Sequence, residues 1–224
     1  MDGNGRWATS RGLARSEGHR AGTEAARAIV TEARTQGIGH LTLYTFSKEN
    51  WGRPGEEVRF LFELLVDFLA REISNLERQS IRLHVFGDMG ALPLAARKAL
   101  EHAMSRTAHC TGMHLNLALN YSGRDEILMA CRALAAKGTK PEDITEDALK
   151  AHLYTAGQPD PDLVIRTSGE LRISNYLLFQ SAYSEFYFTD TLWPDFTPEA
   201  FRMALADYAT RQRRYGRTQA QAAS

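Results

Sequence analysis

Hydrophobic residues along the chain recur at two spacings, which take turns from one end to the other. Stretches with apolar residues at every third or fourth position predict amphipathic helices, and short runs rich in β-branched and aromatic residues predict strands. The predicted helices span residues 23–36, 56–79, 92–107, 124–136, 145–153 and 198–214, and the predicted strands span residues 40–46, 81–86, 114–119, 163–166 and 186–189. This alternation predicts an α/β fold, in which a central, mainly parallel sheet is flanked by helices.

These elements follow one another without a segment that looks like a linker between domains. The chain has 224 residues, which suits one domain with a substantial core, and it contains neither an internal repeat nor a low-complexity stretch. Residues 138–162 are rich in Pro, Lys and Asp and are expected to form a surface excursion. We therefore predict a single domain over residues 1–217, followed by a frayed tail over residues 218–224.

The longest predicted helix, residues 56–79, is unusually apolar over its first half. Between Val58 and Leu69 its apolar side chains cover most of the helix circumference, a wider band than the stripe of an ordinary surface helix. The helix is therefore either buried on all sides or lines an apolar cavity in addition to the core. The pattern alone leaves both interpretations open.

The composition argues against several classes of protein. Lys plus Arg and Asp plus Glu both number 27, so the net charge is zero and nucleic acid is not the expected partner. The two cysteines, Cys110 and Cys131, lack metal-ligand spacing, which favours a reduced, cytoplasmic protein. No apolar run reaches the ~18 residues of a transmembrane helix, and the N-terminus does not resemble a signal peptide. We expect a cytoplasmic protein that is at most peripheral to the inner face of the membrane.

The most informative chemistry lies in residues 166–196. Two arginines, Arg166 and Arg172, flank a Ser-Gly turn, and the hydroxyl of Ser174 follows two residues later. Arginine guanidinium groups match phosphate oxygens bidentately. Further along, the carboxylate of Glu185 sits in an apolar and aromatic run, where burial is costly unless a cation or hydrogen bonds compensate it. Together these residues predict a pyrophosphate group held by arginine, a divalent metal ion nearby and an apolar space alongside.

The N-terminus combines glycines with a local excess of positive charge. Residues 3–8 fit the dinucleotide-binding pattern G-x-G-x-x-A, but no strand precedes them and no ribose-binding acid follows about 20 residues later, which argues against NAD binding. A disordered tail would be the ordinary interpretation of such a start. Arg6, Arg15, His19 and Arg20 argue against it, because they form a basic cluster in a neutral protein. Glycines also let backbone amides approach a phosphate closely.

A further candidate segment, residues 47–54, directly follows the predicted strand that ends at Phe46. Loops at the carboxyl ends of parallel strands are where open α/β sheets bind ligands. The alternative is an ordinary loop that leads into the next helix, with Arg53 as a solvated charge. Elsewhere the seven histidines form no metal triad in the sequence, and we find no Ser-His-Asp arrangement, Walker loop or paired-cysteine site.

Several motifs occur in an order that is specific to one family. Asp-Gly-Asn-Gly-Arg-Trp-Ala begins at residue 2, Gly-His-Arg-Ala-Gly at residue 18 and Tyr-Thr-Phe-Ser-Lys-Glu-Asn-Trp-Gly-Arg-Pro at residue 44, and the block 166–196 follows. The chain thereby resembles the undecaprenyl diphosphate synthases of the cis-prenyltransferase (isoprenyl transferase) family, from residue 1 to about residue 216. Members of that family lack the Asp-Asp-x-x-Asp motif of trans-prenyl synthases, and so does this chain.

This resemblance implies an enzyme of isoprenoid biosynthesis that needs Mg²⁺. It would condense isopentenyl diphosphate repeatedly onto an allylic diphosphate, usually farnesyl diphosphate, to give a long-chain cis-polyprenyl diphosphate such as undecaprenyl diphosphate, a lipid carrier for the cell envelope. The growing hydrocarbon must leave water. The apolar helix 56–79 can wall a tunnel for it, together with the strand face formed by Leu41, Leu43 and Thr45.

The resemblance also assigns roles to single residues. Asp2 matches an essential aspartate that holds Mg²⁺ with the diphosphate, and Glu185 matches a second Mg²⁺ ligand. Asn50 matches a residue often given the role of proton acceptor, but a carboxamide is a poor base and we expect it to orient groups instead. The residues expected around the allylic diphosphate are Gly3, Asn4, Gly5, Arg6, Arg15 and His19, with Trp7 as a neighbouring substrate contact. The expected substrate-binding loop comprises Ser47, Lys48, Glu49, Trp51 and Arg53, and the expected isopentenyl diphosphate site comprises Arg166, Arg172, Ile173 and Ser174.

Three expectations about the whole protein complete the comparison with the family. Residues 214–216 resemble a C-terminal Arg-x-Gly motif, which in a homodimer would bring Arg214 and Gly216 near the partner's site. Non-catalytic partner or isoprenoid-binding subunits of the same fold are the alternative, but they typically lose the Asp-Gly-x-x-Arg motif that Asp2 and Arg6 preserve here. Family members also carry a strand immediately before Met-Asp-Gly, where this sequence starts. We therefore expect a natural start upstream, and a mobile Asp2 in a loop that nothing in this chain holds from its N-terminal side.

Overall fold

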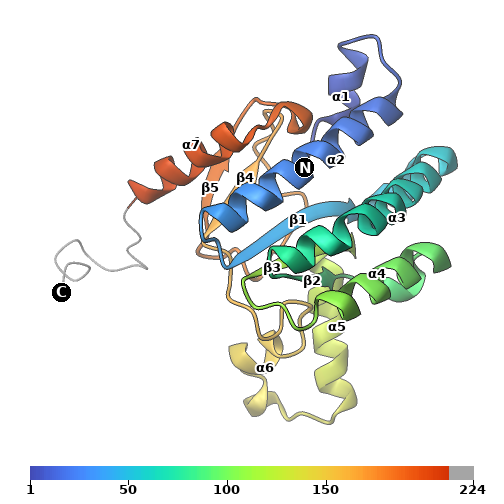
Figure 1. Cartoon of the computed structure of the whole chain (residues 1–224). Coiled ribbons are helices and arrows are strands. Elements are labelled where there is room, and N and C mark those ends of the chain that lie inside the picture. The colour runs from blue at the N-terminus through green and yellow to red at the C-terminus, as the bar shows by residue number, and fades with distance from the viewer. Residues whose placement is uncertain (212–224) are drawn as a thin grey trace.

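The computed structural model describes residues 1–211, and within this range the strands pair in parallel (Figure 1). One sheet has the order β1-β3-β2 and consists of β1 (His40–Ser47), β2 (Ile81–Phe86) and β3 (Met113–Tyr121). A second, two-stranded sheet pairs β4 (Leu163–Arg166) with β5 (Glu185–Phe188). The predicted α/β fold with parallel strands is confirmed, although the strands are divided between two sheets.

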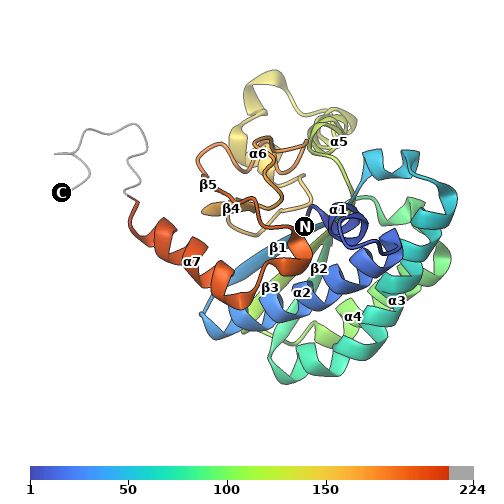
Figure 2. The same cartoon turned by 90° about the horizontal axis from the view of Figure 1, so that it is seen from above.

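Helices lie on both sides of the three-stranded sheet (Figure 2). On one side are α2 (Arg15–Thr35), α3 (Gly55–Arg78) and α4 (Leu94–Thr107). On the other side are α5 (Gly123–Ala136) and α6 (Glu146–Lys150). The short α1 (Asn4–Thr9) packs against α2, and α7 (Pro198–Ala209) contacts both α2 and β5. Among the described residues, no helix is both long enough and apolar enough to cross a membrane.

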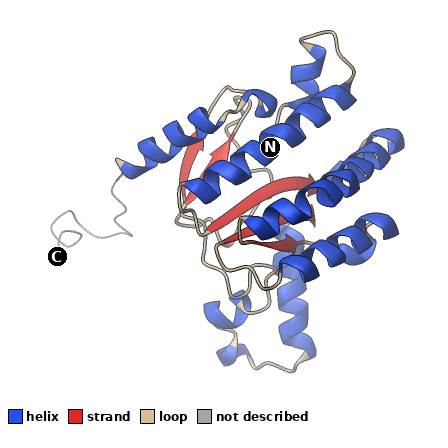
Figure 3. Ribbon diagram, viewed as in Figure 1, coloured by secondary structure: helices blue, strands red, loops and turns tan. Residues whose placement is uncertain are grey.

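The main core forms where α2, α3 and α4 cover the sheet (Figure 3). The central strand β3 is buried along nearly its whole length, which is typical of a parallel strand covered on both faces. Leu83 and Leu115 are almost fully buried on the strands, and Leu69 and Leu100 meet them from the helices. This packing is the main source of stability, because burying one large aliphatic side chain contributes about 1.5–3 kcal/mol.

Four helices differ from the sequence prediction. α6 ends at Lys150 rather than at residue 153, where the chain continues in turns. α2 begins at Arg15 rather than at residue 23, because its first two turns carry charged residues and glycines instead of the apolar spacing that identifies a helix. The six-residue α1 was not predicted, since so short a helix shows no periodicity and depends on its packing. α7 ends at Ala209 instead of residue 214, and residues 212–214 lie outside the described range.

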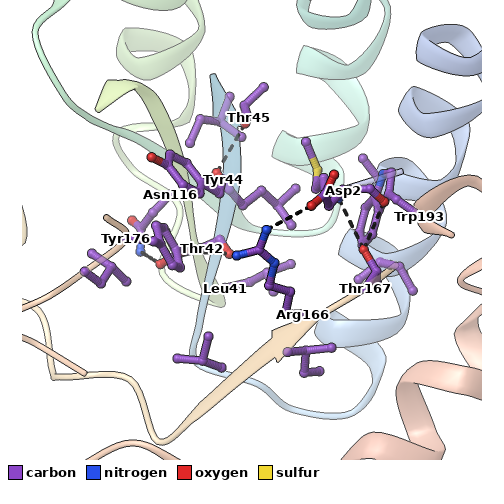
Figure 4. Close-up of a pocket in the computed structure, with 18 of the residues that line it drawn as sticks. Asp2, Leu41, Thr42, Tyr44, Thr45, Asn116, Arg166, Thr167, Tyr176 and Trp193 are labelled. Atoms are coloured by element: carbon purple, nitrogen blue, oxygen red, sulfur yellow. Dashed lines mark hydrogen bonds and ion pairs between the residues drawn. The ribbon is translucent and has the colours of Figure 1, made fainter. Parts of the chain in front are cut away.

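β1 and β4 are the strands that face each other across the gap between the two sheets. Within residues 1–211, β1 pairs with β3 alone and β4 pairs with β5 alone, so each has one edge without a strand partner. Residues of both strands line a common cavity, which also reaches the inner faces of α2 and α3. The arrangement places the carboxyl end of β4 beside the N-terminal residues of the chain, as Figure 4 shows for Arg166 and Asp2.

Candidate active site

The cavity has a volume of about 1300 Å³ and combines a polar end with a long apolar wall. The polar end gathers side chains from three segments of the chain that are far apart in sequence, namely residues 2–19, 47–53 and 166–175. Figure 4 shows Asp2 and Arg166 pointing toward each other at this end. The cavity is therefore suited to a ligand with a charged head and an apolar tail.

Asp2 is held in place by its own backbone. Its carbonyl oxygen accepts hydrogen bonds from the Ser168 hydroxyl (2.6 Å), the Thr167 hydroxyl (3.1 Å) and the Trp193 amide (3.0 Å). The next residue, Gly3, has a φ of +102°, and a side-chain Cβ at this position would lie 2.2 Å from the Ser168 hydroxyl oxygen. These bonds do not support the expected mobility of Asp2, because the turn after β4 and the residues around Trp193 hold the loop in place of a preceding strand.

The Asp2 carboxylate lies between two arginines. Arg166 donates a hydrogen bond to it at 3.0 Å, and Arg6 forms a longer ion pair with it at 3.6 Å. Burial alone would raise the pKa of the Asp2 carboxyl. The hydrogen bond and charge of Arg166, aided by the Met1 ammonium and Arg6, outweigh burial and hold this pKa below its usual value. Asp2 is consequently ionised at neutral pH.

The segment after β4 brings Arg166 and Arg172 together. Arg166 donates hydrogen bonds to the Ser174 hydroxyl (2.7 Å) and to the backbone carbonyl of Arg172. Glu170 lies between the arginines of two segments, since it forms ion pairs with Arg172 and, at 3.2 Å, with Arg6. The sequence prediction did not single out Glu170, although it lies within the block 166–196. In this arrangement the Glu170 carboxylate pairs with the guanidinium groups of Arg6 and Arg172, which could otherwise bind a phosphate.

A second carboxylate, the half-buried Glu57 in the first turn of α3, organises another group of cations. It accepts hydrogen bonds from Arg53 and from the His19 ring, and it pairs with Arg15; each contact is 3.2 Å. Burial raises the pKa of Glu57, but its three partners lower it further and the net pKa is below the usual value. Burial lowers the pKa of His19, and the opposing bond to Glu57 does not fully restore it. The sequence prediction missed Glu57, whose spacing of four residues from Arg53 was the available signal.

Glycines at the N-terminus allow α1 and α2 to cross at close range. A Cβ at Gly18 would lie 2.0 Å from the Asn4 carbonyl oxygen, and a Cβ at Gly22 would lie 2.4 Å from the Asn4 side-chain oxygen. Any larger residue at either position would push the two helices apart. Because the crossing orients Arg6 on α1 and His19 on α2 toward the same cavity, these glycines set the geometry of its polar end.

Asn50 stabilises the loop that follows β1. Its side-chain oxygen accepts a hydrogen bond from the Ser47 amide at 3.1 Å, and the Ser47 hydroxyl accepts one from the Asn50 amide in return. The carboxamide is thus already engaged in a local turn. This geometry suits a residue that orients the loop and gives no support to a role as a base.

The long wall of the cavity is apolar. α3 presents Leu61, Phe62, Leu64, Leu65 and Phe68 to it, α2 presents Ala26, Ile29 and Val30, and β1 presents Leu41, Leu43 and Thr45. Phe62 and Leu65 are also members of the buried core. The question left open by the wide apolar band of α3 is therefore resolved, because the helix both packs in the core and lines a cavity.

The similarity of the chain to known proteins identifies its family. The family described as "Putative undecaprenyl diphosphate synthase" matches residues 1–216. The chain belongs to this family. Two relatives named isoprenyl transferase are each 50% identical to this chain. The protein from Clostridium tetani matches 96% of this chain and 86% of its own length. The protein from Geobacter sulfurreducens matches 99% of this chain and 92% of its own length. The chain is thus an enzyme that transfers prenyl groups.

Solved structures agree with this identification. The prenyltransferase is similar to lavandulyl diphosphate synthase from Lavandula x intermedia, solved in complex with dimethylallyl diphosphate, with a TM-score of 0.94 and 38% identity over 96% of this chain and 95% of that chain. A probable undecaprenyl diphosphate synthase from Campylobacter jejuni is similar with a TM-score of 0.79 and 32% identity, over 88% of this chain and 93% of that chain. The resemblance stated from the motifs is confirmed for the whole fold.

Most of the predicted site residues of the prenyltransferase line the same cavity. From the N-terminal segments these are Asp2, Gly3, Asn4, Gly5, Arg6, Arg15 and His19. From the loop after β1 they are Ser47, Glu49, Asn50 and Arg53, and from the segment after β4 they are Arg166, Arg172, Ile173 and Ser174. Their convergence is a structural fact, whereas the role of each stays a prediction.

Other predicted residues do not line this cavity. Trp7 donates to Asp195, Lys48 pairs with Asp125, and Trp51 donates to Asn120 while stacking on Phe62. Glu185 does not line the cavity and is paired with Arg211 at 3.0 Å. Arg214 and Gly216 lie outside the described residues. Within residues 1–211, no group of three or more His, Cys, Asp or Glu side chains is arranged to hold a metal ion.

Proposed function

We propose that this prenyltransferase condenses isopentenyl diphosphate repeatedly onto an allylic diphosphate, with farnesyl diphosphate as the starter, to make a long-chain cis-polyprenyl diphosphate such as undecaprenyl diphosphate. The observation that carries the proposal is the union of arginines from three segments with a long apolar wall in one cavity. The arginines suit the diphosphates of both substrates, and the wall suits a growing hydrocarbon.

The two diphosphates are assigned to the two groups of cations. In line with the resemblance to the family, Arg166, Arg172 and Ser174 would bind isopentenyl diphosphate, and the bond from Arg166 to the Ser174 hydroxyl holds two of these groups together. Arg6, Arg15, His19 and Arg53 would bind the allylic diphosphate beside the amides of the glycine-rich turn. In this assignment Arg6, which pairs with both Asp2 and Glu170, lies at the boundary between the two sites.

In the reaction, the allylic C–O bond breaks and the diphosphate leaves with the electron pair. The double bond of isopentenyl diphosphate supplies the electrons of the new C–C bond, and a proton is then lost to regenerate a double bond. The developing negative charge on the leaving diphosphate must be neutralised for the bond to break at a useful rate. Arg6 and Arg53 would supply that charge from fixed positions, and the apolar wall would exclude water from the reactive carbon.

Asp2 fits the requirements of a magnesium ligand. Mg²⁺ typically takes one or two protein carboxylates and completes its coordination with water and substrate phosphates. The Asp2 side chain is ionised, is 41 % exposed and lines the polar end of the cavity, so it would hold the ion together with a diphosphate. When bound, Mg²⁺ would act as a Lewis acid that neutralises diphosphate charge. Arg166, the present partner of Asp2, would then be available to the substrate.

Three further parts of the proposal extend beyond the cavity. Glu185 is proposed as a second Mg²⁺ ligand, which requires its carboxylate to leave Arg211. The protein is proposed to act as a homodimer, with Arg214 and Gly216 near the partner's site. It is also proposed to be cytoplasmic, with a peripheral membrane contact through which the long product is released.

The experiment that tests the function is a product assay with farnesyl diphosphate, labelled isopentenyl diphosphate and Mg²⁺. We expect a ladder of products that extends to long chains, and its loss when Mg²⁺ is removed by a chelator. A single condensation product, or another carbon skeleton, would contradict repeated chain elongation. No turnover with any allylic starter would favour a non-catalytic partner subunit.

A further inference from the structure

The segment after Arg172 has an unusual backbone. Ser174, Asn175 and Leu177 have φ values of +49°, +60° and +42°, all in the left-handed region. This conformation is costly for residues other than glycine, and asparagine tolerates it better than serine or leucine. Such a run persists only where the surrounding contacts determine it. The contacts of Asn175 supply that restraint.

Every hydrogen-bonding group of the Asn175 side chain has a partner. Its amide nitrogen donates to the Glu49 carboxylate at 2.9 Å and to the Ser122 hydroxyl at 2.8 Å. Its side-chain oxygen accepts from the Arg124 amide at 2.9 Å, and its backbone carbonyl accepts from the Gly123 amide at 2.8 Å. One residue thus joins the loop after β1, the N-terminus of α5 and the segment that carries Arg172 and Ser174.

The segment packs closely against the start of α5. A Cβ at Gly123 would lie 3.0 Å from the Asn175 carbonyl oxygen and 2.9 Å from Leu178. The amides at the start of α5 are free donors of a helix N-terminus, and Asn175 satisfies two of them. The segment is therefore fixed to a rigid element on one side, and its bond to Glu49 is the part that reaches into the cavity, which both residues line.

We propose that Asn175 is a positioning residue that fixes the spacing between two substrate-binding segments, the loop that carries Glu49 and the segment that carries Arg172 and Ser174. The inference rests on the assignment of Arg172 and Ser174 to isopentenyl diphosphate under the proposed function. Glu49 lies on a five-residue 3-10 turn (Lys48–Gly52), and Asn175 ties this short element to α5. The spacing matters because condensation requires the two reacting carbons to be aligned closely.

The ionisation of Glu49 supports this coupling. Burial raises the pKa of the Glu49 carboxyl, and the charge of Asp125 in the first turn of α5 raises it as well. The hydrogen bond from Asn175, with smaller bonds from the Glu49 backbone and Ser47, outweighs both and brings the net pKa below the usual value. Removing the Asn175 donor should therefore raise the pKa of Glu49. As the pH is lowered, any property that needs the Glu49 carboxylate should then be lost at a higher pH than in the wild type.

The decisive variant is Asn175→Asp, which keeps the size of the side chain and its tolerance of the left-handed backbone. One carboxylate oxygen can still accept from the Arg124 amide at the helix N-terminus, where negative charge is favourable. The other oxygen faces Glu49 and repels it. We expect KM for isopentenyl diphosphate to rise about tenfold, the scale of one lost hydrogen bond to a charged group, with a smaller change in kcat. The acid limb of the pH profile should move to higher pH.

The rescue variant is Asn175→Asp combined with Glu49→Gln. The new carboxamide at position 49 can donate to the new carboxylate at position 175, which restores the bond with donor and acceptor exchanged. KM should therefore return close to that of Glu49→Gln alone. The matched control is Asn75→Asp, because Asn75 donates to the Glu72 carboxylate at 2.9 Å outside the cavity. This control places the same charge beside a carboxylate, and it should lower thermal stability without raising KM.

Affinity for inorganic pyrophosphate, measured by calorimetry, gives the same test without turnover. Asn175→Asp should weaken it and the double variant should restore it. Wild-type KM and affinity in Asn175→Asp would overturn the proposal, and so would a double variant whose KM stays well above that of Glu49→Gln alone. Arg172→Lys, measured in parallel, distinguishes this failure from that of the proposed function: wild-type binding in Arg172→Lys would show that the site assignment itself is wrong.

Discussion

The polar end and the apolar wall of the cavity are built in different ways. At the polar end each cation is matched with a carboxylate: Arg166 with Asp2, Arg6 with Glu170, and the Arg53 group with Glu57. The apolar wall consists of aliphatic and aromatic side chains from α2, α3 and one face of β1. The first region depends on loops and turns brought together from distant parts of the chain, whereas the second depends on two long helices and a strand.

This difference separates two properties of the enzyme. Arginines that are already paired must exchange a carboxylate for a diphosphate, so substitutions at the polar end should change rate and affinity. The wall has no charge to exchange, and its shape alone decides how much hydrocarbon it admits. Substitutions there should change the length of the product more than the rate of the first condensation.

The largest effect is expected for Asp2→Ala at the polar end. Loss of a metal ligand removes charge stabilisation that builds up in the transition state. The activation free energy should therefore rise by about 4 kcal/mol, which lowers the turnover rate roughly a thousandfold. Thermal unfolding should change little, because the backbone carbonyl of Asp2 makes the structural bonds. The control Asp67→Ala, on the exposed side of α3, should leave turnover unchanged. Near-normal turnover of Asp2→Ala with Mg²⁺ present would refute the metal role.

A smaller and more selective effect is expected for Arg172→Lys. Lysine keeps the charge but loses the bidentate fork, so KM for isopentenyl diphosphate should rise about tenfold while KM for farnesyl diphosphate changes little. Steady-state kinetics with each substrate varied in turn checks this. Equal rises in both KM values, or a rise for the allylic substrate alone, would show that the two sites are assigned the wrong way round.

Glu57→Gln tests the second carboxylate through stability. The folded-state pKa of Glu57 is below its ordinary value of 4.5, so its charge stabilises the fold above that pH, and this contribution is lost as the pH falls through the lowered pKa. The variant should unfold about 4 °C below the wild type at pH 7, and the difference should shrink in acid below pH 4.5. Glu101→Gln, which removes an exposed ion pair with Lys98, should change neither the unfolding temperature at pH 7 nor its dependence on pH. If the difference in unfolding temperature persists unchanged in acid, Glu57 does not stabilise the fold through its charge.

The smallest effect on rate is expected for Thr45→Leu in the apolar wall. The Thr45 side chain is half-buried on β1, so a larger residue there should narrow the tunnel and shorten the products without slowing the first condensations. Thr31→Leu, on the exposed face of α2, makes the same change in volume outside the cavity. An unchanged product ladder for Thr45→Leu would place this residue away from the path of the hydrocarbon.

The sequence predicted the elements of the fold where burial leaves a clear pattern. β3 and α3 follow from their apolar runs, because a covered parallel strand and a wide apolar helix are both visible in residue order. α1 and the start of α2 were missed, since they are held by glycine-mediated contact rather than by apolar spacing. The division of the strands into two sheets was also not predicted, because it depends on contacts between distant segments.

The candidate site was predicted through its motifs but not through its pairings. Glu170 contacts Arg6 from the opposite end of the chain, and no local pattern reveals a contact of that kind. Trp7 and Trp51 lie in the predicted segments yet point elsewhere, because the direction of a side chain in a short helix or turn is set by packing. Motifs therefore located the segments, and the structure was needed to decide which side chains share the cavity.

The most direct test of the division between polar end and apolar wall is a time course of labelled products, resolved by chain length, for Arg172→Lys and Thr45→Leu at an isopentenyl diphosphate concentration below the wild-type KM. We predict that Arg172→Lys builds the wild-type range of lengths more slowly, and that Thr45→Leu completes its first condensations at the wild-type rate but stops at shorter chains. If Arg172→Lys shortens the final products as much as Thr45→Leu does, or if Thr45→Leu slows the first condensation as much as Arg172→Lys does, the two regions do not control separate properties and the account is wrong.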